Sequence, residues 1–337
     1  MEQRSVLLGF SGGIDSCASA RWLIEQGYRV VALTIDTTHD STLLAKAEAK
    51  AREIGIEWHT IDLSTEFRIQ IINYFTESYR QGLTPAPCTR CNPLIKWSTL
   101  YDFANEHDID LIATGHYFCI KHHNGKYYVA KGADPTKDQS YYLWGLSQDI
   151  LSRAITPMAD AIKNDIKIGL KDKSESMGIC FLNGCHYTDF LRNNGVEFIH
   201  GDICLINGEV VGHHNGIVRY TIGQRRGEGI PEGLRVIDID AEHNRLIVGE
   251  NDKLYKRVLY INDCYVVDHD EVVTAGNITI KIRGIGRNPE GCVRISAWYD
   301  GYRIECQDPA WAPAKGQPLV FYRNNLVIGG GIVVDFE

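Results

Sequence analysis

Two features of this sequence are suited to chemistry: a loop rich in glycine and serine near its start, and a set of cysteines. The loop is Ser11-Gly12-Gly13-Ile14-Asp15-Ser16. An apolar, strand-like run precedes it at residues 6–10, and a helical pattern follows at residues 17–26. At such a turn the backbone N–H groups and the positive helix end face outward, and glycine lets an anion approach the backbone. The loop therefore predicts a phosphate site, with an ordinary glycine-rich turn as the alternative.

The loop differs from the common nucleotide motifs. It lacks the Gly-Lys-Ser/Thr of a Walker loop and the G-x-G-x-x-G of a dinucleotide site. Asp15 could hold Mg²⁺ between phosphates, or it could simply be an acid in the first helical turn. The string S-G-G-x-D-S resembles the loop of the ATP-pyrophosphatase superfamily, whose members cleave ATP between the α and β phosphates. This resemblance implies ATP and Mg²⁺ as cofactors.

The cysteines form the second feature. Cys88 and Cys91 make a C-x-x-C in a proline-rich stretch, residues 84–93, for which we predict a loop. In a reducing compartment such a pair indicates redox, metal or sulfur chemistry rather than a structural disulfide. Cys180 lies in a short apolar run, residues 177–181. From the residues alone it could equally be a small buried side chain of the core.

Length and composition limit the possible functions. The chain has 337 residues, enough for two or three domains, and a formal net charge of −8, which argues against a non-specific polyanion binder. No run approaches the roughly 20 apolar residues that span a bilayer. The first residues lead almost directly into a strand, without a basic and apolar leader. We therefore expect no membrane association and a cytoplasmic location.

The pattern of elements predicts an α/β fold. Strands alternate with helices up to about residue 195, which indicates a parallel sheet with ligands beyond the carboxyl ends of its strands. Short β runs separated by Gly and Asn turns follow. We expect domains at residues 1–195, 196–265 and 266–337: an ATP-binding catalytic domain, a small β-rich linking domain and a β-barrel. The predicted strands of the first domain are residues 6–10, 30–36, 58–63 and 110–117, and its predicted helices are residues 17–26, 41–54, 66–79, 94–106 and 149–170.

Several strings in order identify a family. The phosphate loop, T-P-x-P-x-x-x-C-N, A-T-G-H-Y, K-D-Q-S-Y-x-L, G-I-C-F and T-I-G-Q-R-R-G occur in that sequence along the chain. From about residue 6 to residue 330 the chain resembles the tRNA-specific 2-thiouridylases, the MnmA family. The resemblance implies an N-terminal domain like the adenine-nucleotide α-hydrolases. It also implies an enzyme, a tRNA-uridine 2-sulfurtransferase, that uses ATP to thiolate the wobble uridine at tRNA position 34.

In this reaction ATP adenylates the C2 oxygen of uracil and sulfur then replaces that oxygen. The resemblance makes Cys91 the nucleophile and Cys180 the carrier of a persulfide. The implied partners are tRNA and a sulfur donor protein, either a cysteine desulfurase or a relay carrier, and we expect a monomer. Many members carry Asp at the position of Cys88. Here Cys88, Cys91 and Cys180 could instead hold a [4Fe–4S] cluster whose open iron binds hydrosulfide, so persulfide and cluster remain alternatives.

Further roles follow from the resemblance, position by position. Ala86 stands where Asn is usual and Gly284 where an aromatic residue is usual, so those two contacts are altered here. Lys163, Lys167, Lys171 and Lys173 would make a phosphate-positioning face or a solvated helix side. The implied ATP-binding residues are Gly9, Phe10, Ser11, Gly12, Gly13, Ile14, Asp15, Ser16, Leu33 and Gly115. The implied tRNA-binding residues are Ala86, Pro87, Cys88, His116, Lys137, Asp138, Gln139, Arg283, Gly284 and Gln317.

Two kinds of rival remain. Other enzymes with this loop, such as amidotransferase-type synthetases, argininosuccinate synthetase and tRNA-lysidine synthetase, do not account for Cys91 together with Cys180. A non-catalytic tRNA-binding or sulfur-carrier adaptor would have no need of an intact pyrophosphate loop.

Overall fold

The computed structural model describes residues 3–162 and 178–337. The chain forms two compact units. The first contains Met1–Ile71, Cys88–Glu175 and Asn325–Ile328, and the second contains Ile72–Pro87, Ser176–Asn324 and Gly329–Glu337. Lys163, Lys167, Lys171 and Lys173 lie outside the described residues.

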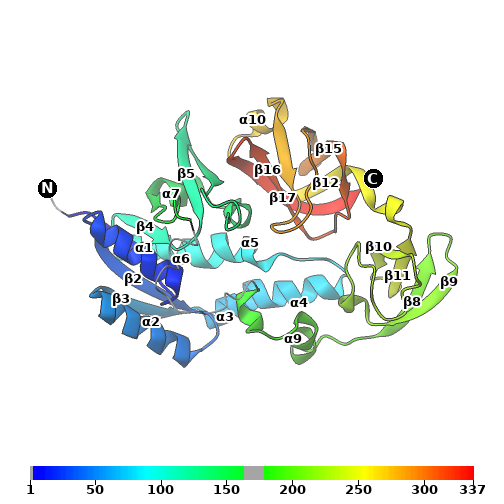
Figure 1. The fold of residues 1–337 in the computed structure, drawn as a ribbon, viewed down its shortest axis with the longest axis horizontal. Helices are drawn as coiled ribbons and strands as arrows, with labels where there is room; N and C mark the ends of the chain where they lie inside the picture. The colour runs from blue at the N-terminus through cyan, green and yellow to red at the C-terminus, as the bar shows by residue number, and fades with distance from the viewer. Residues whose placement is uncertain (1–2, 163–177) are drawn as a thin grey trace. The chain divides into compact units, whose positions relative to one another are not determined.

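A parallel sheet forms the centre of the first unit (Figure 1). Its strand order is β3-β2-β1-β4-β7, and every neighbouring pair is parallel. Strands with helical crossovers give this arrangement, so the predicted parallel sheet is confirmed. The strands are β1 (Ser5–Gly9), β2 (Arg29–Asp36), β3 (Glu57–Asp62), β4 (Leu111–Thr114) and β7 (Ala154–Ile155).

Helices cover both faces of this sheet. Helices α1 (Ile14–Glu25) and α2 (Ser41–Ile54) bury Leu23 and Ala47 in one cluster with Val6 and Leu8 of β1. The next residue of β1, Gly9, faces the other way, and a Cβ there would lie 3.3 Å from Leu100 of α6 (Trp97–Glu106). Alternate residues of β1 thus pack against different helices, as expected for a strand buried on both faces.

The strand order places a topological switch point between β1 and β4. From β1 the chain crosses to β2 and β3 on one side, whereas β4 and β7 lie on the other. Ligands of open α/β sheets bind at such a point, beyond the carboxyl ends of the strands. The loop after β1 and the segment after β4 are therefore the two pieces of chain that should form a site.

The helical region between β3 and β4 contains wide turns. The predicted helix 66–79 is confirmed, as α3 (Ser64–Phe67), the π-helical η1 (Arg68–Ile72) and α4 (Asn73–Arg80). A second π-helical turn, η2 (Asn92–Lys96), leads into α6. The predicted loop at residues 84–93 is wrong in part, because Pro87–Cys91 is helical and forms α5. Proline is tolerated in a first helical turn, where its missing N–H has no partner to lose.

The predicted helix at residues 149–170 is also wrong in part, and its residues 163–170 lie outside the described residues. Helix α7 (Gln148–Arg153) begins at Ser147, whose hydroxyl accepts from the N–H of Ile150, and it ends at Arg153. Ala154 and Ile155 instead extend the sheet as β7, where Ala154 pairs with Ile112. A hairpin that we did not predict, β5 (Phe118–His123) with β6 (Lys126–Lys131), follows β4, and the 3₁₀ turn η3 (Ser140–Leu143) comes after it.

The second unit contains α4 and is otherwise mainly β-structure. One sheet has the order β10-β11-β8-β9, and a larger, mostly antiparallel sheet contains the order β13-β16-β17-β12-β15-β14. The predicted β-rich region after residue 196 is therefore confirmed. Its elements are η4 (Cys180–Leu182), α9 (Tyr187–Asn193), β8 (His200–Leu205), β9 (Val210–Asn215), η5 (Ile217–Arg219), β10 (Arg235–Asp240), β11 (Arg245–Gly249), η6 (Asn251–Leu254), β12 (Tyr255–Val266), α10 (His269–Thr274), β13 (Ile278–Lys281), β14 (Val293–Trp298), β15 (Gly301–Trp311), β16 (Pro318–Arg323) and β17 (Leu326–Phe336).

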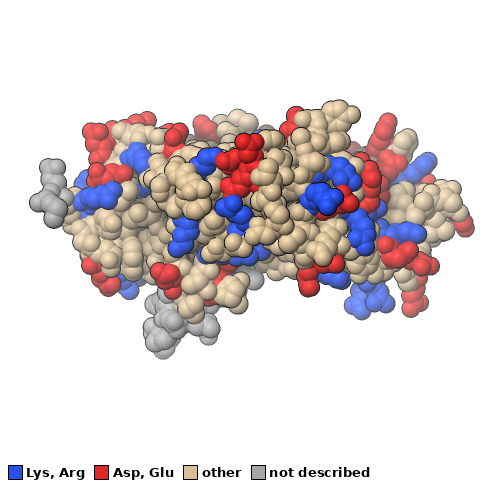
Figure 2. Space-filling model, turned by 90° about the horizontal axis from the view of Figure 1, so that it is seen from above, with Lys and Arg blue, Asp and Glu red and all other residues tan. Residues whose placement is uncertain are grey.

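The distribution of charged side chains and the character of the helices agree with the amino-acid composition. Acidic and basic side chains are interspersed over the face that Figure 2 shows. Over residues 3–162 and 178–337, no helix combines the length and the apolar character needed to cross a bilayer.

Candidate active site

The phosphate loop follows β1 and includes the first residues of α1, at the strand-to-helix turn that the sequence predicts. Gly12 has φ +65°, and a Cβ there would lie 2.9 Å from the Cα of Ala47 in α2, so only glycine fits. Gly13 is the N-cap residue of α1, and no side chain caps this described helix end. The Ser16 hydroxyl donates to the Gly13 carbonyl at 3.0 Å, and Ser11 Oγ accepts from the Gly13 N–H at 3.3 Å. An uncapped helix end within a glycine turn fits an anionic phosphate.

The segment after β4 touches this loop directly. A Cβ on Gly115 would lie 3.1 Å from both Asp15 C and Ser16 N, so the two backbones meet with no room for a side chain. Two residues later, the Tyr117 hydroxyl donates to Asp15 Oδ1 at 2.8 Å. The structure therefore brings the predicted Gly115 and Asp15 together, and it adds Tyr117, which the sequence analysis quoted in A-T-G-H-Y without assigning it a role.

Phe10, which directly precedes the phosphate loop, is joined to Leu33 of the neighbouring strand β2. Both side chains are buried, and the Phe10 N–H donates to the Leu33 carbonyl at 2.9 Å. The Thr34 hydroxyl donates to the Phe10 carbonyl at 2.7 Å. These bonds fix the end of β1 against β2. The contact of Leu33 with ATP stays a prediction.

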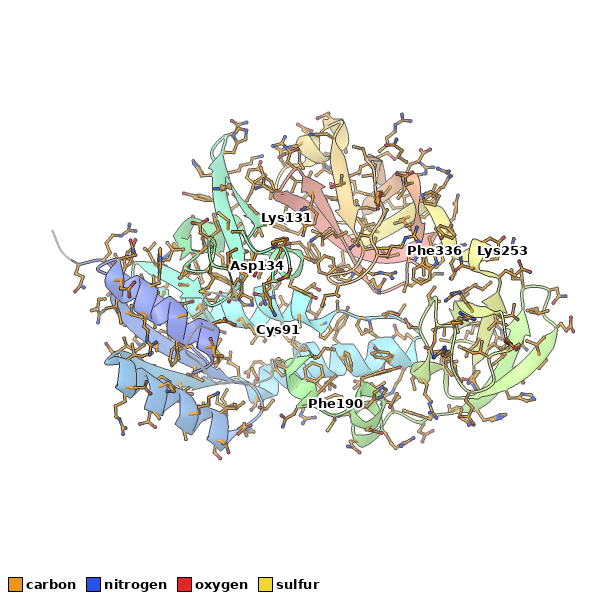
Figure 3. The ribbon with its side chains drawn as sticks, in the orientation of Figure 1. Cys91, Lys131, Asp134, Phe190, Lys253 and Phe336 are labelled. Carbon is orange, nitrogen blue, oxygen red and sulfur yellow. The ribbon has the colours of Figure 1, made fainter. Side chains whose placement is uncertain are left out.

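Cys88 and Cys91 lie on α5, with Cys91 only 4% exposed and Cys88 half-buried (Figure 3 labels Cys91). The helix is held at its end. Arg90 Nε donates to the Gln70 carbonyl at 3.1 Å, and Asn92 Nδ2 donates to the Tyr142 carbonyl at 2.9 Å. The fixed helix sets the position of Cys91, and burial keeps its thiol away from bulk water.

Partly and fully buried aromatic and imidazole groups belong to the same unit. Burial, and to a smaller extent the Lys96 ammonium, lowers the pKa of His116 to about 3. Its ring stacks on Trp97, and its Nδ1 lies 2.8 Å from Thr114 Oγ1. Burial, and next the Cys88 thiolate, raises the pKa of Tyr142. His116 is therefore neutral at physiological pH, and any RNA contact it makes is a hydrogen bond or a stacking contact rather than an ion pair.

Cys180 belongs to the second unit, where it is exposed at the start of η4. The next residue, Phe181, is 7% exposed and packs against two aromatic rings. Its ring centroid lies 5.2 Å from that of Phe75 and 5.0 Å from that of Phe190, which Figure 3 labels on α9. Phe181 anchors the turn while Cys180 stays accessible. This arrangement suits a thiol that must be loaded by another molecule.

Three predicted tRNA-binding residues between β6 and η3, Lys137, Asp138 and Gln139, make internal hydrogen bonds. Asp138 accepts from the Ser140 N–H and hydroxyl, and Gln139 Oε1 accepts from the Tyr117 N–H. Lys137 lies in the same turn, and its N–H donates to the Asp134 carbonyl. Their tRNA contacts stay predictions.

The other predicted tRNA-binding residues are spread over the chain. Arg283 donates to the carbonyls of Trp311 and Ala312, at 3.2 and 2.6 Å, and its guanidinium lies over the Trp311 ring. Gln317 Oε1 is buried and has no hydrogen-bond partner among the described residues. Gly284 follows β13, Ala86 precedes α5, and Pro87 is the first residue of α5.

The sequence analysis did not predict a group of three residues whose side chains could bind a metal ion. Asp36, His39 and Asp62 have ligand atoms within 4.8 Å of one another, at the carboxyl ends of β2 and β3. No short motif connects residues of two strands, so only the parallel pairing of β2 and β3 could have indicated this group.

Comparisons with known proteins agree with this architecture. Three family models match successive parts of the chain: a tRNA methyl transferase HUP domain at residues 4–184, a tRNA methyl transferase PRC-barrel domain at 188–250, and an aminomethyltransferase β-barrel domain at 256–333. The tRNA-specific 2-thiouridylase MnmA 1 of Clostridium botulinum is 35% identical over 355 aligned residues, covering 98% of this chain and 99% of the relative. The MnmA of Natranaerobius thermophilus is 35% identical, covering 99% and 98%, and MnmA 3 of Bacteroides fragilis is 36% identical, covering 98% and 94%.

A parallel sheet with a phosphate loop at its switch point, followed by β-rich domains, defines a HUP-domain protein with β-barrel extensions. Sequence identity above one third with full-length relatives narrows the assignment from this class of protein to one family. The chain belongs to the tRNA-specific 2-thiouridylase family, MnmA. The predicted family, fold class and enzyme class, a tRNA-uridine 2-sulfurtransferase, are therefore confirmed.

Proposed function

We propose that this protein thiolates C2 of the wobble uridine of tRNA, at position 34, in an ATP-dependent reaction. The observation that carries the proposal is the phosphate loop at the β1–β4 switch point, in the same compact unit as the buried thiol of Cys91. Full-length relatives named as tRNA-specific 2-thiouridylases support it.

The first step activates the base. The C2 oxygen of uracil attacks the α phosphorus of ATP, the bond between the α and β phosphates breaks, and pyrophosphate leaves. Ser11, Ser16 and the first N–H groups of α1 would bind the phosphates, because they form the uncapped helix end described above. Asp15 would hold Mg²⁺, which neutralises phosphate charge when it is bound. Adenylation turns a poor leaving oxygen into part of AMP.

The second step transfers sulfur. A donor protein first loads Cys180 as a persulfide, which its exposure permits. Cys91 attacks the inner sulfur of Cys180, the outer sulfur leaves as hydrosulfide, and a Cys91–Cys180 disulfide forms. Hydrosulfide attacks C2, AMP departs, and an external thiol reductant restores the two cysteines. Water must be kept from the adenylate, and a buried Cys91 is consistent with such a site.

A [4Fe–4S] cluster is the alternative source of sulfide. Three thiolates, from Cys88, Cys91 and Cys180, fit the ligand count of a cluster with one open iron. When bound, it would supply hydrosulfide without a persulfide on Cys180. Protein purified without oxygen that contains no iron and loads sulfur on Cys180 would rule this alternative out.

Thiolation itself is the decisive test. Purified protein is incubated with Mg²⁺, ATP, a persulfide donor and unmodified tRNA, and 2-thiouridine is measured by mass spectrometry of the digested RNA. We expect product with wild type and none with Cys91→Ser, Cys180→Ser or Asp15→Ala. The matched control is Cys292→Ser, a half-buried cysteine of the second unit that has no role in the proposal.

The same assay separates an enzyme from a binding protein. If Asp15→Ala binds tRNA as wild type does but forms no product, the loop serves catalysis. If wild type binds tRNA and forms no product with any donor, the enzyme proposal is refuted and a non-catalytic adaptor is favoured.

A further inference from the structure

The backbone of Tyr117 is held on both of its polar sides by one residue. Gln139 Oε1 accepts from the Tyr117 N–H at 2.8 Å, and the Gln139 N–H donates to the Tyr117 carbonyl at 2.9 Å. These bonds join the end of β4 to a turn 22 residues later in the chain. Both polar groups of one peptide segment are thereby satisfied by a single partner, which fixes where the Tyr117 side chain begins.

The turn that carries Gln139 is itself tightly bonded. Asp138 accepts from the Gly132 N–H at 3.4 Å and from the Ser140 N–H and hydroxyl at 3.2 and 3.0 Å. Asp134, labelled in Figure 3, accepts from the N–H and hydroxyl of Thr136. A Cβ on Gly132 would lie 3.2 Å from the carbonyl carbon of Tyr117, so the turn packs directly on that backbone. The turn is therefore a rigid support rather than a free surface loop.

The other end of Tyr117 reaches the phosphate loop. Its hydroxyl donates to Asp15 Oδ1 at 2.8 Å, and the intervening Gly115 packs on the backbone of Asp15 and Ser16. A carboxylate that must face phosphate or Mg²⁺ gains from one fixed orientation, because orienting it later would cost free energy in the reacting complex.

We propose that Tyr117 and Gln139 are positioning residues of the adenylation step: Gln139 fixes Tyr117, and the Tyr117 hydroxyl fixes the Asp15 carboxylate. The proposal rests on the proposed function and deepens it. It gives the Gln139 of K-D-Q a task in ATP use that is separate from the predicted tRNA contact.

Tyr117→Phe tests the second link, because it removes one hydroxyl and leaves the ring. We expect single-turnover pyrophosphate release with saturating tRNA to slow by roughly 10- to 100-fold, the usual effect of one hydrogen bond to a charged group. Magnesium-dependent binding of a non-hydrolysable ATP analogue, measured by calorimetry without tRNA, should weaken as well. The tRNA dissociation constant should stay within about twofold of wild type. Unchanged pyrophosphate release would overturn the proposal.

Two substitutions test the first link. Gln139→Glu keeps a side-chain acceptor for the Tyr117 N–H, so it should slow adenylation less than Gln139→Leu does. Gln139→Leu removes the acceptor and should slow adenylation about as much as Tyr117→Phe, and the double variant should lose little more because both act through one contact. A purely tRNA-binding Gln139 gives the reverse pattern. Its Leu variant would weaken tRNA binding without slowing adenylation, and the added charge of Glu would weaken binding further.

The proposal and the proposed function fail in distinguishable ways. Absence of pyrophosphate release by wild type, with ATP and unmodified tRNA, refutes the proposed function. If wild type releases pyrophosphate and both Tyr117→Phe and Gln139→Leu release it at the wild-type rate, only the positioning roles are refuted. Thermal melting of each variant shows whether it is folded. If a Gln139 variant melts at a lower temperature than wild type, the positioning roles are judged from Tyr117→Phe, which is the mildest change.

Discussion

His116 should make the stability of this protein depend on pH in a specific window. Burial, and next the Lys96 charge, lowers its pKa from the ordinary 6.5 to about 3 in the folded protein. Between these values the unfolded chain binds a proton that the folded chain does not. The contribution of His116 to the free energy of unfolding is therefore fully present above the pKa of the unfolded chain. It is lost as the pH falls toward the pKa of the folded protein.

The size of the effect follows from the unfolded titration. Between about pH 7.5 and about pH 5 the folded imidazole stays neutral, so the loss comes from protonation in the unfolded state and amounts to about 2 kcal/mol. His116→Asn abolishes this titration and keeps a side-chain acceptor for Thr114. Between these two pH values, the free energy of unfolding of the variant should thus fall by about 2 kcal/mol less than that of wild type.

Urea unfolding of the two proteins at both pH values, followed by tryptophan fluorescence, gives this double difference. Other titrating groups contribute equally to both proteins and cancel. The matched control is His123→Asn, an exposed histidine at the end of β5, which should behave as wild type does. A double difference near zero, or an imidazole of His116 that titrates by NMR above about pH 5, would refute the argument that burial keeps this ring neutral.

Three further predictions concern packing. Phe181→Ala removes an aromatic ring from the contacts with Phe75 and Phe190; hydrogen exchange at residues 178–193 should accelerate, with a local loss of about 3 kcal/mol, and Phe181→Leu should lose less. Gly115→Ala places a Cβ 3.1 Å from Asp15 C and Ser16 N; the KM for ATP should rise while tRNA binding is retained, and an unchanged KM would show that the loop can shift. Arg283→Ala removes the donors to the Trp311 and Ala312 carbonyls; thermal melting should show a loss of roughly 1–3 kcal/mol, whereas weaker tRNA binding at unchanged stability would favour the predicted RNA contact.

The sequence was sufficient for the sheet and the phosphate loop, because both depend on local patterns. Apolar runs that alternate with amphipathic segments predict a parallel sheet, and Ser11–Ser16 lies where such a sheet binds anions. Helix α2 was predicted at its observed bounds; in the structure the Asp40 side chain caps its start and Gly55 ends it. Those signals are carried by residues close together in the chain.

Features that depend on distant pairing could not be predicted in the same way. Pro85 and Pro87 suggested a loop, yet α5 continues into η2 and α6, and this tertiary setting decides its conformation. The β5–β6 hairpin turns at Asn124-Gly125, both with positive φ, and this dipeptide was a usable signal that the sequence analysis overlooked. The bonds between Gln139 and Tyr117 depend on backbone geometry, so no spacing rule could have given them.

The π-helical turn η2 begins directly after Cys91 and ends where α6 begins. Such a turn amounts to one residue inserted into an otherwise continuous α-helix. Deleting a single position from 92–96 would let this turn return to ordinary winding with little rotation of Cys88 and Cys91 relative to Trp97, because the wide turn takes up the extra residue. The turn therefore takes up one residue of chain between the two cysteines and Trp97 without changing the helix face from which the thiols project.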